Sequence, residues 1–310
     1  MTTEPHLERR RTAADLLVEC LEAEGVEYVF SVPGEETMDV LDGLSRSTRI
    51  RHVTTRHEQG AAFMADVYGR LTGRPGVAMA TLGPGATNLV TGIADAYLDH
   101  APLVAITGQT GIDKLHKESH QFVDVVRMLE PVTKWSSRVE LASSVPEIVR
   151  KAFRLATLEK PGPTHLELPE DVAASTVGDD LRPLPRSQVF FPEPTDEAIE
   201  RAARLVAESE RPIILAGNGV LRRRASPELR ELARGLHVPV AATFMGKGAV
   251  DDRSHLSLMA VGLQARDHVL TGFDRADLVI CVGYDPVEYA PGRWNPDGRK
   301  PILHIDTTPA

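Results

Sequence analysis

The feature that most constrains the fold is an alternation of short apolar runs with longer segments of helical periodicity. In the first half of the chain the apolar runs lie at 26–32, 50–54, 76–81, 102–107 and 163–168. The helical patterns lie at 12–24, 36–46, 58–72, 87–98, 121–129 and 145–159. Strands joined through helices pair in parallel, and a parallel sheet is covered on both faces. We therefore predict a doubly wound α/β domain over residues 1–175.

The segment 176–195 interrupts this alternation, and we interpret it as a linker because it contains four prolines and few periodic apolar residues. A second α/β pattern follows over 196–310 and predicts a Rossmann-like domain. Its expected helices are 195–208, 226–236 and 263–271, and its expected strands are 212–216, 238–242, 277–283 and 301–306. No helix follows the last strand, so we expect this second domain to be incomplete at its C-terminal end.

Charge and cysteine content narrow the classes of function. The net charge is −9 and no tract concentrates Lys or Arg, which argues against a nucleic-acid surface. Cys20 and Cys281 are far apart, fit no metal spacing or disulfide framework, and predict buried free thiols in a cytoplasmic protein. No apolar run reaches about 18 residues, and the polar N-terminus does not match a secretory signal, so we expect no membrane contact.

The first candidate functional residue is Glu58, in the run Thr54-Thr55-Arg56-His57-Glu58-Gln59-Gly60-Ala61-Ala62. A predicted strand ends near Thr54 and a predicted helix begins near Glu58, where the helix dipole favours an anion. The small residues that follow allow a neighbouring helix or a cofactor to approach closely. A glutamate in a first turn also commonly caps its helix, so position alone leaves that simpler interpretation open.

Two further loops follow predicted strands. Gly83-Pro84-Gly85 lies between Thr81 and Asn88, and Pro33-Gly34 ends the first predicted strand. Ligands bind at the carboxyl ends of strands in α/β sheets, and glycine allows the backbone to approach them. A tight turn without a ligand would have the same composition, and the pattern is neither a Walker loop nor a dinucleotide fingerprint.

A polar loop, Lys114-Leu115-His116-Lys117-Glu118-Ser119-His120-Gln121, precedes a predicted helix. Its two histidines are four residues apart, but a metal site would need further ligands and none has a suitable spacing. We interpret the loop as the solvated edge of a binding site, and we predict no metal ligands in this chain.

Several of these motifs together resemble the thiamine-diphosphate enzymes of the acetolactate synthase group. The resemblance rests on the run 56–66, Tyr68-Gly69-Arg70, the run 83–88, Lys117-Glu118-Ser119-His120-Gln121, Pro131-Val132-Thr133-Lys134, the run 166–172, the run 276–289 and His304-Ile305-Asp306. These segments cover nearly the whole chain. The resemblance implies that 1–175 is a pyrimidine-binding domain and 196–310 most of a central domain. The third domain of such enzymes carries a Gly-Asp-Gly motif for Mg²⁺ and diphosphate, which this sequence lacks, so the resemblance implies that the chain alone is inactive.

The resemblance also implies the roles of particular residues. Glu58 matches the carboxylate that hydrogen-bonds the pyrimidine of thiamine diphosphate and activates the cofactor. Asp would be a methylene shorter, and Gln could not exchange the proton. The residues that match pyrimidine-pocket positions are Pro33, Gly34, Thr81, Pro84, Gly85 and Asn88. Gln121 matches a glutamine on the substrate side. The implied reaction decarboxylates pyruvate and joins the resulting two-carbon unit to a second 2-keto acid.

Relatives that bind FAD carry an Arg-Phe-Asp-Asp-Arg-like run where this chain has Tyr284-Asp285-Pro286-Val287-Glu288. The resemblance is therefore to the FAD-free, catabolic type, although Gly217-Asn218-Gly219 is a short pattern of the kind found in dinucleotide loops. Pyruvate oxidase and 2-keto-acid decarboxylase share Glu58 and the Gly-Pro-Gly loop, and a non-catalytic binding fragment is a rival from another class. Active sites of the group lie between subunits, which implies a homodimer or homotetramer.

Overall fold

The computed structural model describes residues 10–115, 117–186, 191–262 and 267–308. The chain divides into two compact units, Met1–Val189 and Phe190–Ala310, and the division falls inside the segment interpreted as a linker. Within the described ranges, no helix has both the length and the apolar character needed to cross a membrane.

The first unit is built around a six-stranded sheet in which neighbouring strands are parallel. Its strands are β1 (Tyr28–Ser31), β2 (Arg51–Thr54), β3 (Gly76–Ala80), β4 (Leu103–Gln109), β5 (Trp135–Arg138) and β6 (Pro163–Pro169). Their spatial order is β2-β1-β3-β4-β6-β5. The chain moves outward from β1 to β2 and then returns past β1 to β3. Between β1 and β3 the sheet therefore has a topological switch point, where ligands of such sheets bind.

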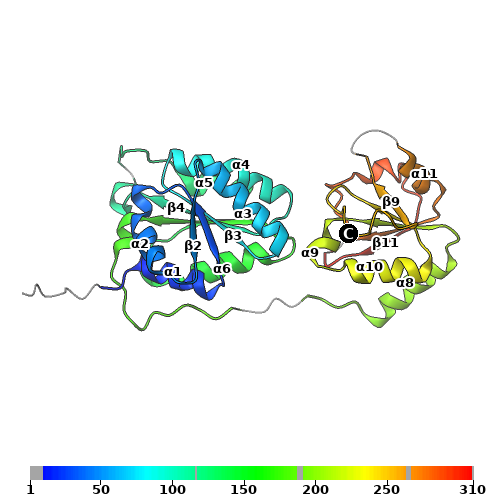
Figure 1. The fold of residues 1–310 in the computed structure, drawn as a ribbon, viewed down its shortest axis with the longest axis horizontal. Helices are drawn as coiled ribbons and strands as arrows, with labels where there is room; N and C mark the ends of the chain where they lie inside the picture. The colour runs from blue at the N-terminus through cyan, green and yellow to red at the C-terminus, as the bar shows by residue number, and fades with distance from the viewer. Residues whose placement is uncertain (1–9, 116, 187–190, 263–266, 309–310) are drawn as a thin grey trace, which may run out of the picture. The chain divides into compact units, whose positions relative to one another are not determined.

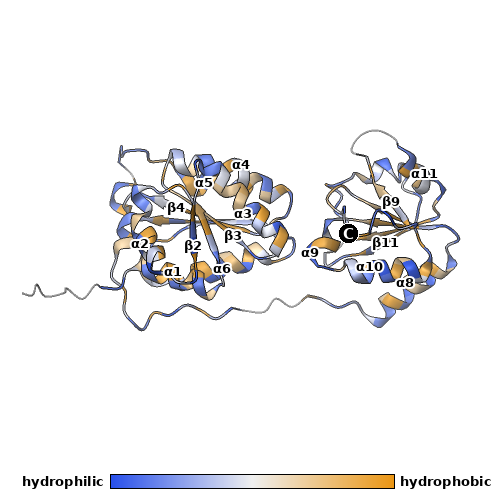
Figure 2. Cartoon of the chain, in the orientation of Figure 1, coloured by the Kyte–Doolittle hydropathy of each residue, from blue (hydrophilic) through white to orange (hydrophobic). Residues whose placement is uncertain are grey.

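Helices cover both faces of this sheet, as predicted (Figure 1). One core contains side chains of α1 (Ala13–Ala23), α2 (Met38–Arg46), α6 (Val145–Thr157) and α7 (Glu170–Ala174), and the other those of α3 (Glu58–Thr72), α4 (Pro84–Leu98) and α5 (Val125–Leu129). Hydrophilic and hydrophobic residues are interspersed along these helices (Figure 2). Thr12 caps the N-terminus of α1, because its hydroxyl accepts from Asp15 N.

Several elements of this unit differ from the prediction. β5 was not predicted, because its sequence Trp-Ser-Ser-Arg is mostly polar and every residue is half-buried. α4 begins at Pro84 rather than at 87, since proline suits the first position of a helix. α5 begins at Val125 rather than at 121, because Gln121 has a φ of 56°, which no helix accommodates.

The second unit contains a five-stranded sheet, also with parallel neighbours. Its strands are β7 (Pro212–Ala216), β8 (Val240–Ala242), β9 (Ser257–Ala260), β10 (Leu278–Val282) and β11 (Ile302–Ile305), in the order β11-β10-β7-β8-β9. α8 (Asp196–Glu208), α9 (Asn218–Arg222) and α10 (Ser226–Leu236) pack on one face, and α11 (His268–Arg275) packs on the other. Both units are thus parallel α/β domains, as predicted.

In this second unit β9 and α9 were not predicted. Both are short, and β9 contains Met259 at a φ of 66°, which breaks the regular alternation of a strand. The helix predicted over 263–271 corresponds to α11, whose described part begins at His268, and residues 263–266 lie outside the described residues. Among the described residues, five short 3₁₀ helices complete the elements: η1 (Glu35–Thr37), η2 (Ile112–Lys114), η3 (Glu130–Val132), η4 (Ala142–Ser144) and η5 (Pro291–Arg293).

Candidate functional site

The loops that follow β1 and β3 meet at the switch point of the first sheet. A Cβ atom placed on Gly34 would lie 2.4 Å from Thr81 Cβ, and one placed on Gly85 would lie 2.8 Å from Thr81 Cγ2. Glycine is therefore required at both positions for the loops to approach Thr81 this closely. The two loops that the sequence singles out separately line one edge of the sheet.

Glu58 joins this edge from the first turn of α3. The helix start is capped by His57, whose Nδ1 accepts from Gln59 N at 3.1 Å. The Glu58 carboxylate is turned toward α4 instead, where Asn88 Nδ2 donates to Glu58 Oε2 at 3.0 Å. The simpler interpretation of Glu58 as the helix cap is therefore wrong.

The space beside Glu58 is bounded by glycine. A Cβ placed on Gly85 would lie 3.5 Å from Glu58 Oε1. Because residue 85 is glycine, this carboxylate oxygen faces backbone there and no side chain. Behind it, Gly83 adopts a φ of 51° and precedes the N-terminus of α4, whose first N–H groups attract acceptor atoms. The edge of the sheet therefore presents a half-buried carboxylate beside a stretch of backbone without side chains.

Glu36 is a second carboxylate at the same edge, which the sequence analysis did not identify. It accepts a hydrogen bond from Thr81 Oγ1. A Cβ placed on Gly108 would lie 2.9 Å from Glu36 Cβ, so Glu36 is wedged between the ends of β3 and β4. The sequence signal that could have identified Glu36 is its place two residues after Gly34, close to the end of a predicted strand.

The remaining predicted residues lie at the rim. Pro33 and Pro84 are exposed next to Gly34 and Gly85. Gln121 is exposed as well, and its backbone oxygen would lie 2.3 Å from a Cβ on Gly83. The structure thus places the loop that carries Gln121 directly against the Gly-Pro-Gly turn.

The described residues contain no group of three or more side chains that could hold a metal ion. Of the two histidines in the polar loop, His120 is exposed and His116 lies outside the described residues.

Next to this edge, polar side chains cross β4, β6 and β5 in two rows on one face of the sheet. In the first row His165 Nε2 lies 2.9 Å from Thr107 Oγ1, its Nδ1 lies 2.8 Å from Ser136 Oγ, and Ser136 Oγ donates to Val126 O at 3.0 Å. Burial lowers the pKa of His165 to about 3. This row therefore contains a neutral imidazole that joins three strands to α5.

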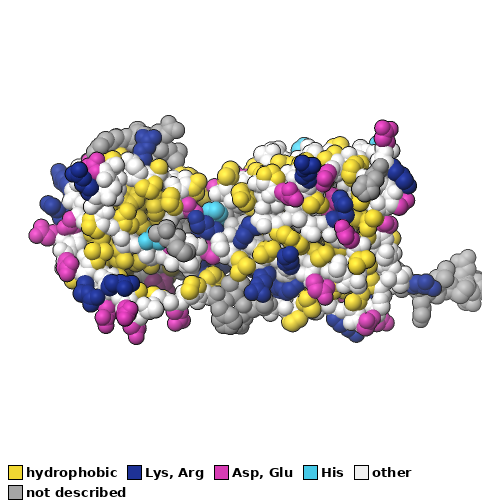
Figure 3. Space-filling view, turned by 180° about the vertical axis from the view of Figure 1, so that it is seen from behind, with side chains coloured by type: hydrophobic (Ala, Val, Ile, Leu, Met, Phe, Trp, Pro, Cys, Tyr) yellow, Lys and Arg dark blue, Asp and Glu magenta, His cyan; other side chains and the backbone are white. Residues whose placement is uncertain are grey.

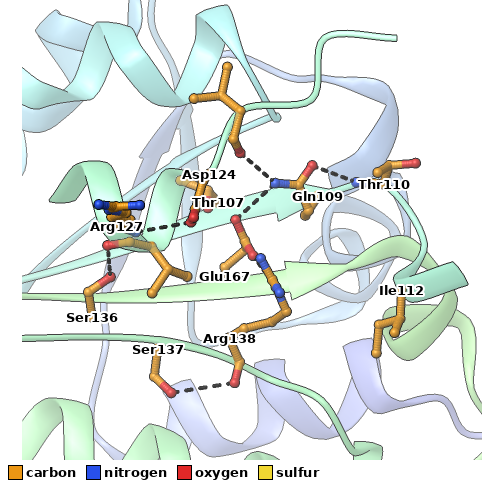
Figure 4. A network of polar contacts seen from close by, with 12 residues as sticks. Thr107, Gln109, Thr110, Ile112, Asp124, Arg127, Ser136, Ser137, Arg138 and Glu167 are labelled. Atoms are coloured by element: carbon orange, nitrogen blue, oxygen red, sulfur yellow. Dashed lines mark hydrogen bonds and ion pairs between the residues drawn. The ribbon is translucent and has the colours of Figure 1, made fainter. Parts of the chain in front are cut away.

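The second row lies closer to the carboxyl ends of the strands (Figure 4). Gln109 Nε2 donates to Glu167 Oε2 and to Val123 O, both at 3.0 Å, and Arg138 Nε donates to Glu167 Oε1 at 2.5 Å. Burial raises the pKa of Glu167, and the Arg138 guanidinium acts in the opposite direction. The first row ends on a backbone carbonyl of α5, that of Val126, and the second on that of Val123, just before the helix.

The second unit has a carboxylate of its own at the ends of its strands. Glu288 accepts from Asn218 N at 3.1 and 3.2 Å and from Thr243 Oγ1, and only 9% of it is exposed. Burial raises the pKa of Glu288. The loops after β7, β8 and β10 are thus joined by this side chain.

Each of the two units matches a family model. Residues 11–128 match the N-terminal binding domain of the thiamine pyrophosphate (thiamine diphosphate) enzymes, and residues 199–310 match their central domain. The chain is 38% identical over 306 residues to a probable acetolactate synthase large subunit of Methanocaldococcus jannaschii, covering 96% of this chain and 51% of the relative.

Two other relatives are similar to a comparable degree. Acetolactate synthase 2, chloroplastic, of Nicotiana tabacum is 38% identical over 301 residues, with 96% of this chain and 45% of the relative covered. Acetolactate synthase of Mycobacterium leprae is 35% identical over 304 residues, with 96% and 48% covered. This chain spans about half the length of these relatives. With an N-terminal binding domain followed by a central domain, the chain belongs to the thiamine pyrophosphate enzymes.

Proposed function

We propose that this chain is part of an acetolactate synthase, which decarboxylates pyruvate and joins the two-carbon product to a second 2-keto acid. The observation that carries the proposal is the Glu58 carboxylate, held by Asn88 beside Gly85 at the switch point of the first sheet. The similarity to acetolactate synthases over 96% of the chain supports it. In the proposal, Mg²⁺ and the diphosphate group bind to a third domain.

Bound thiamine diphosphate supplies the nucleophilic carbon that attacks the 2-keto acid. The role of Glu58 is to share a proton with the pyrimidine ring along a hydrogen bond, which a carboxylate can accept and return. Asn88 orients this carboxylate through its 3.0 Å hydrogen bond. Gly85 and Gly34 keep side chains away from the ring, and Thr81 holds both loops in place through its contacts with them.

The test is acetolactate formation from pyruvate with thiamine diphosphate and Mg²⁺, by this chain and by a version extended through any downstream coding sequence. Glu58→Ala in the active version should lower kcat by about a hundredfold or more, the range of acid–base catalysis. Glu58→Gln should be equally impaired, because an amide cannot exchange the proton. Glu130→Ala, at an exposed carboxylate, is the matched control.

The identity of the product separates the proposal from its rivals. Acetyl phosphate as the product would assign the protein to the pyruvate oxidases, and a free aldehyde would assign it to the decarboxylases. Absence of turnover in the extended version, or full activity of Glu58→Ala, would contradict the proposal and favour a binding role without catalysis.

We further propose that the second unit binds no FAD. Glu288 occupies the backbone N–H of Asn218 at the end of β7, and its carboxylate would repel an anionic phosphate there. A purified protein with a stoichiometric flavin absorbance would overturn this.

The partners we propose are 2-keto acids and further copies of the same protein. The exposed faces of α3 and α4, the helices that carry Glu58 and Asn88, contain the large apolar side chains of Met64, Val67, Leu71, Tyr97 and Leu98. Exposed apolar surface of this kind favours association, which light scattering would measure. On the face drawn in Figure 3, basic side chains are interspersed with acidic ones, which is consistent with a small-molecule substrate rather than a nucleic acid.

A further inference from the structure

The loop described over 110–115 and 117–124, which carries Gln121, is held at both ends through carboxylates from one short segment. That segment, Leu166-Glu167-Leu168-Pro169-Glu170-Asp171-Val172, spans the end of β6 and the start of α7. The sequence analysis singled it out as a motif, and the catalytic proposal gives it no role.

At the beginning of the loop, the contacts come from Glu170 and Asp171. Glu170 Oε1 accepts from Gly111 N at 3.2 Å and from Lys114 Nζ at 2.8 Å. Asp171 Oδ2 accepts from Ile112 N at 3.1 Å. A carboxylate that accepts from backbone N–H groups restrains the position and orientation of the backbone there, because a peptide N–H cannot rotate independently of the chain.

At the end of the loop, the contact comes from Glu167 through Gln109. The Gln109 amide donates to Glu167 and to Val123 O, and its Oε1 accepts from Thr110 N at 3.0 Å. The Gln109 side chain is fully buried and uses three of its four hydrogen-bonding positions in these contacts, so it has one orientation. Glu167 is fully buried as well and is paired with Arg138, whose side chain in turn comes from the neighbouring strand (Figure 4).

Between the two held ends the backbone turns sharply at Gln121. Gln121 has a φ of 56°, which is unfavourable for a residue with a side chain. Its backbone oxygen packs against Gly83, at the start of the Gly-Pro-Gly turn. A strained turn of this kind persists only when its surroundings determine it.

We propose that Glu167, Glu170 and Asp171 are positioning residues, which together hold the loop so that Gln121 stays at the rim beside Gly83. This inference rests on the proposed function only in that Gln121 serves the substrate there. None of the three carboxylates touches the site at Glu58 in this arrangement. They act through the backbone of the loop.

We call the three carboxylates Glu167, Glu170 and Asp171 the clamp. Hydrogen exchange measured by mass spectrometry on the whole 310-residue chain tests whether the clamp holds the loop, and it requires no enzymatic activity. The variant Glu170→Ala/Asp171→Ala removes the three hydrogen bonds at the beginning of the loop. Glu170 is half-buried and Asp171 is exposed, so neither substitution opens a cavity in the core. We expect exchange in the peptide 117–123 to become about tenfold faster, because a lost charge-assisted hydrogen bond opens the loop more often. Glu167→Ala should have the same effect from the other end.

The conservative variant Glu170→Gln/Asp171→Asn retains acceptor oxygens and should restore slow exchange, which distinguishes positioning from a loss of negative charge. Glu140→Ala, an exposed acid just beyond β5, is the matched control and should leave this peptide unchanged. Unchanged exchange at 117–123 in the double alanine variant would exclude the clamp.

Turnover gives a second readout in the version that forms acetolactate. The double alanine variant should raise KM for pyruvate severalfold more than it lowers kcat, and the Gln/Asn variant should restore KM. Accelerated exchange with an unaltered KM would reject a role for the clamp in the reaction. An inactive wild type would instead reject the proposed function, and the clamp would then be decided by exchange alone.

Discussion

At the scale of single residues, the hydrogen-bond partners of a side chain decide its chemistry more than its place in a motif does. Ser136 has one hydroxyl proton, which it donates to Val126 O, so it must accept from Nδ1–H of His165. His165 Nε2 then accepts from the Thr107 hydroxyl. The neutral ring pairs both of its nitrogens and also accepts the Thr107 hydroxyl proton, which would lose this acceptor if Nε2 were protonated. Protonation would place two donors against two hydroxyls inside the protein.

This arrangement predicts a loss of stability in mild acid. The pKa of His165 is about 3 in the folded chain and near 6.5 in the unfolded one, so the unfolded state binds the extra proton as pH falls below 6.5. The stability that His165 contributes is complete above pH 6.5 and falls by about 1.4 kcal/mol per pH unit below it. Urea unfolding at pH 7 and pH 5 measures this effect. His165→Gln should be less stable at pH 7 and should lose less between the two pH values, and an equal loss in both proteins would contradict the assignment.

At the scale of elements, α3 and α4 have to keep their relative position, because the hydrogen bond between Glu58 and Asn88 joins the two helices. Arg70 of α3 bridges them: its guanidinium lies 2.8 Å from Asp66, 2.6 Å from Asp95 and 2.6 Å from Asp99. Asp66 is almost fully buried, and burial raises its pKa. Removing the arginine would leave a buried carboxylate without its cation.

Arg70→Met should therefore lower the free energy of unfolding by about 3 kcal/mol, in the range for breaking a buried ion pair at one partner. Denaturant unfolding followed by circular dichroism measures it. Arg74→Met, which breaks the exposed pair with Glu27, is the control and should cost much less. The further change Asp66→Asn should recover part of the loss, and equal losses for the Arg70 and Arg74 variants would argue against the bridge.

At the scale of the whole molecule, the hydrophobic cores divide between the two units, and each unit contains one of the two tryptophans. Two core clusters belong to the first unit and two to the second. Trp135 is half-buried in β5, whereas Trp294 is fully buried with its ring 6.0 Å from that of Phe273. Tryptophan fluorescence can therefore report on each unit separately.

We expect Phe273→Ala to destabilise the second unit alone, by about 3–5 kcal/mol, the usual cost of deleting a buried phenylalanine. In a Trp135→Phe background, the remaining Trp294 should report a lower urea midpoint. In a Trp294→Phe background, Trp135 should report an unchanged one. A common shift of both midpoints would show instead that the two units unfold together.

The sequence by itself determined the elements and the residues at their ends. Hydrophobic periodicity is local, so it predicted the parallel α/β class and α3 from Glu58 to Thr72 within its stated bounds. The resemblance added the assignment of Glu58, which nothing in the pattern distinguished from a helix cap. Short or polar elements such as β5 and α7 lack enough periodicity to be predicted.

Only the tertiary structure decided which of these residues meet. The rows across β4, β6 and β5 exist because strands far apart in the chain are neighbours in the sheet, which brings Gln109, Glu167 and Arg138 together. The hydrogen bond from Thr81 to Glu36 likewise joins two loops that are far apart in the sequence. Hydrogen bonds and ion pairs depend on distances of about 3 Å, and spacing along a sequence specifies such distances only within a single element.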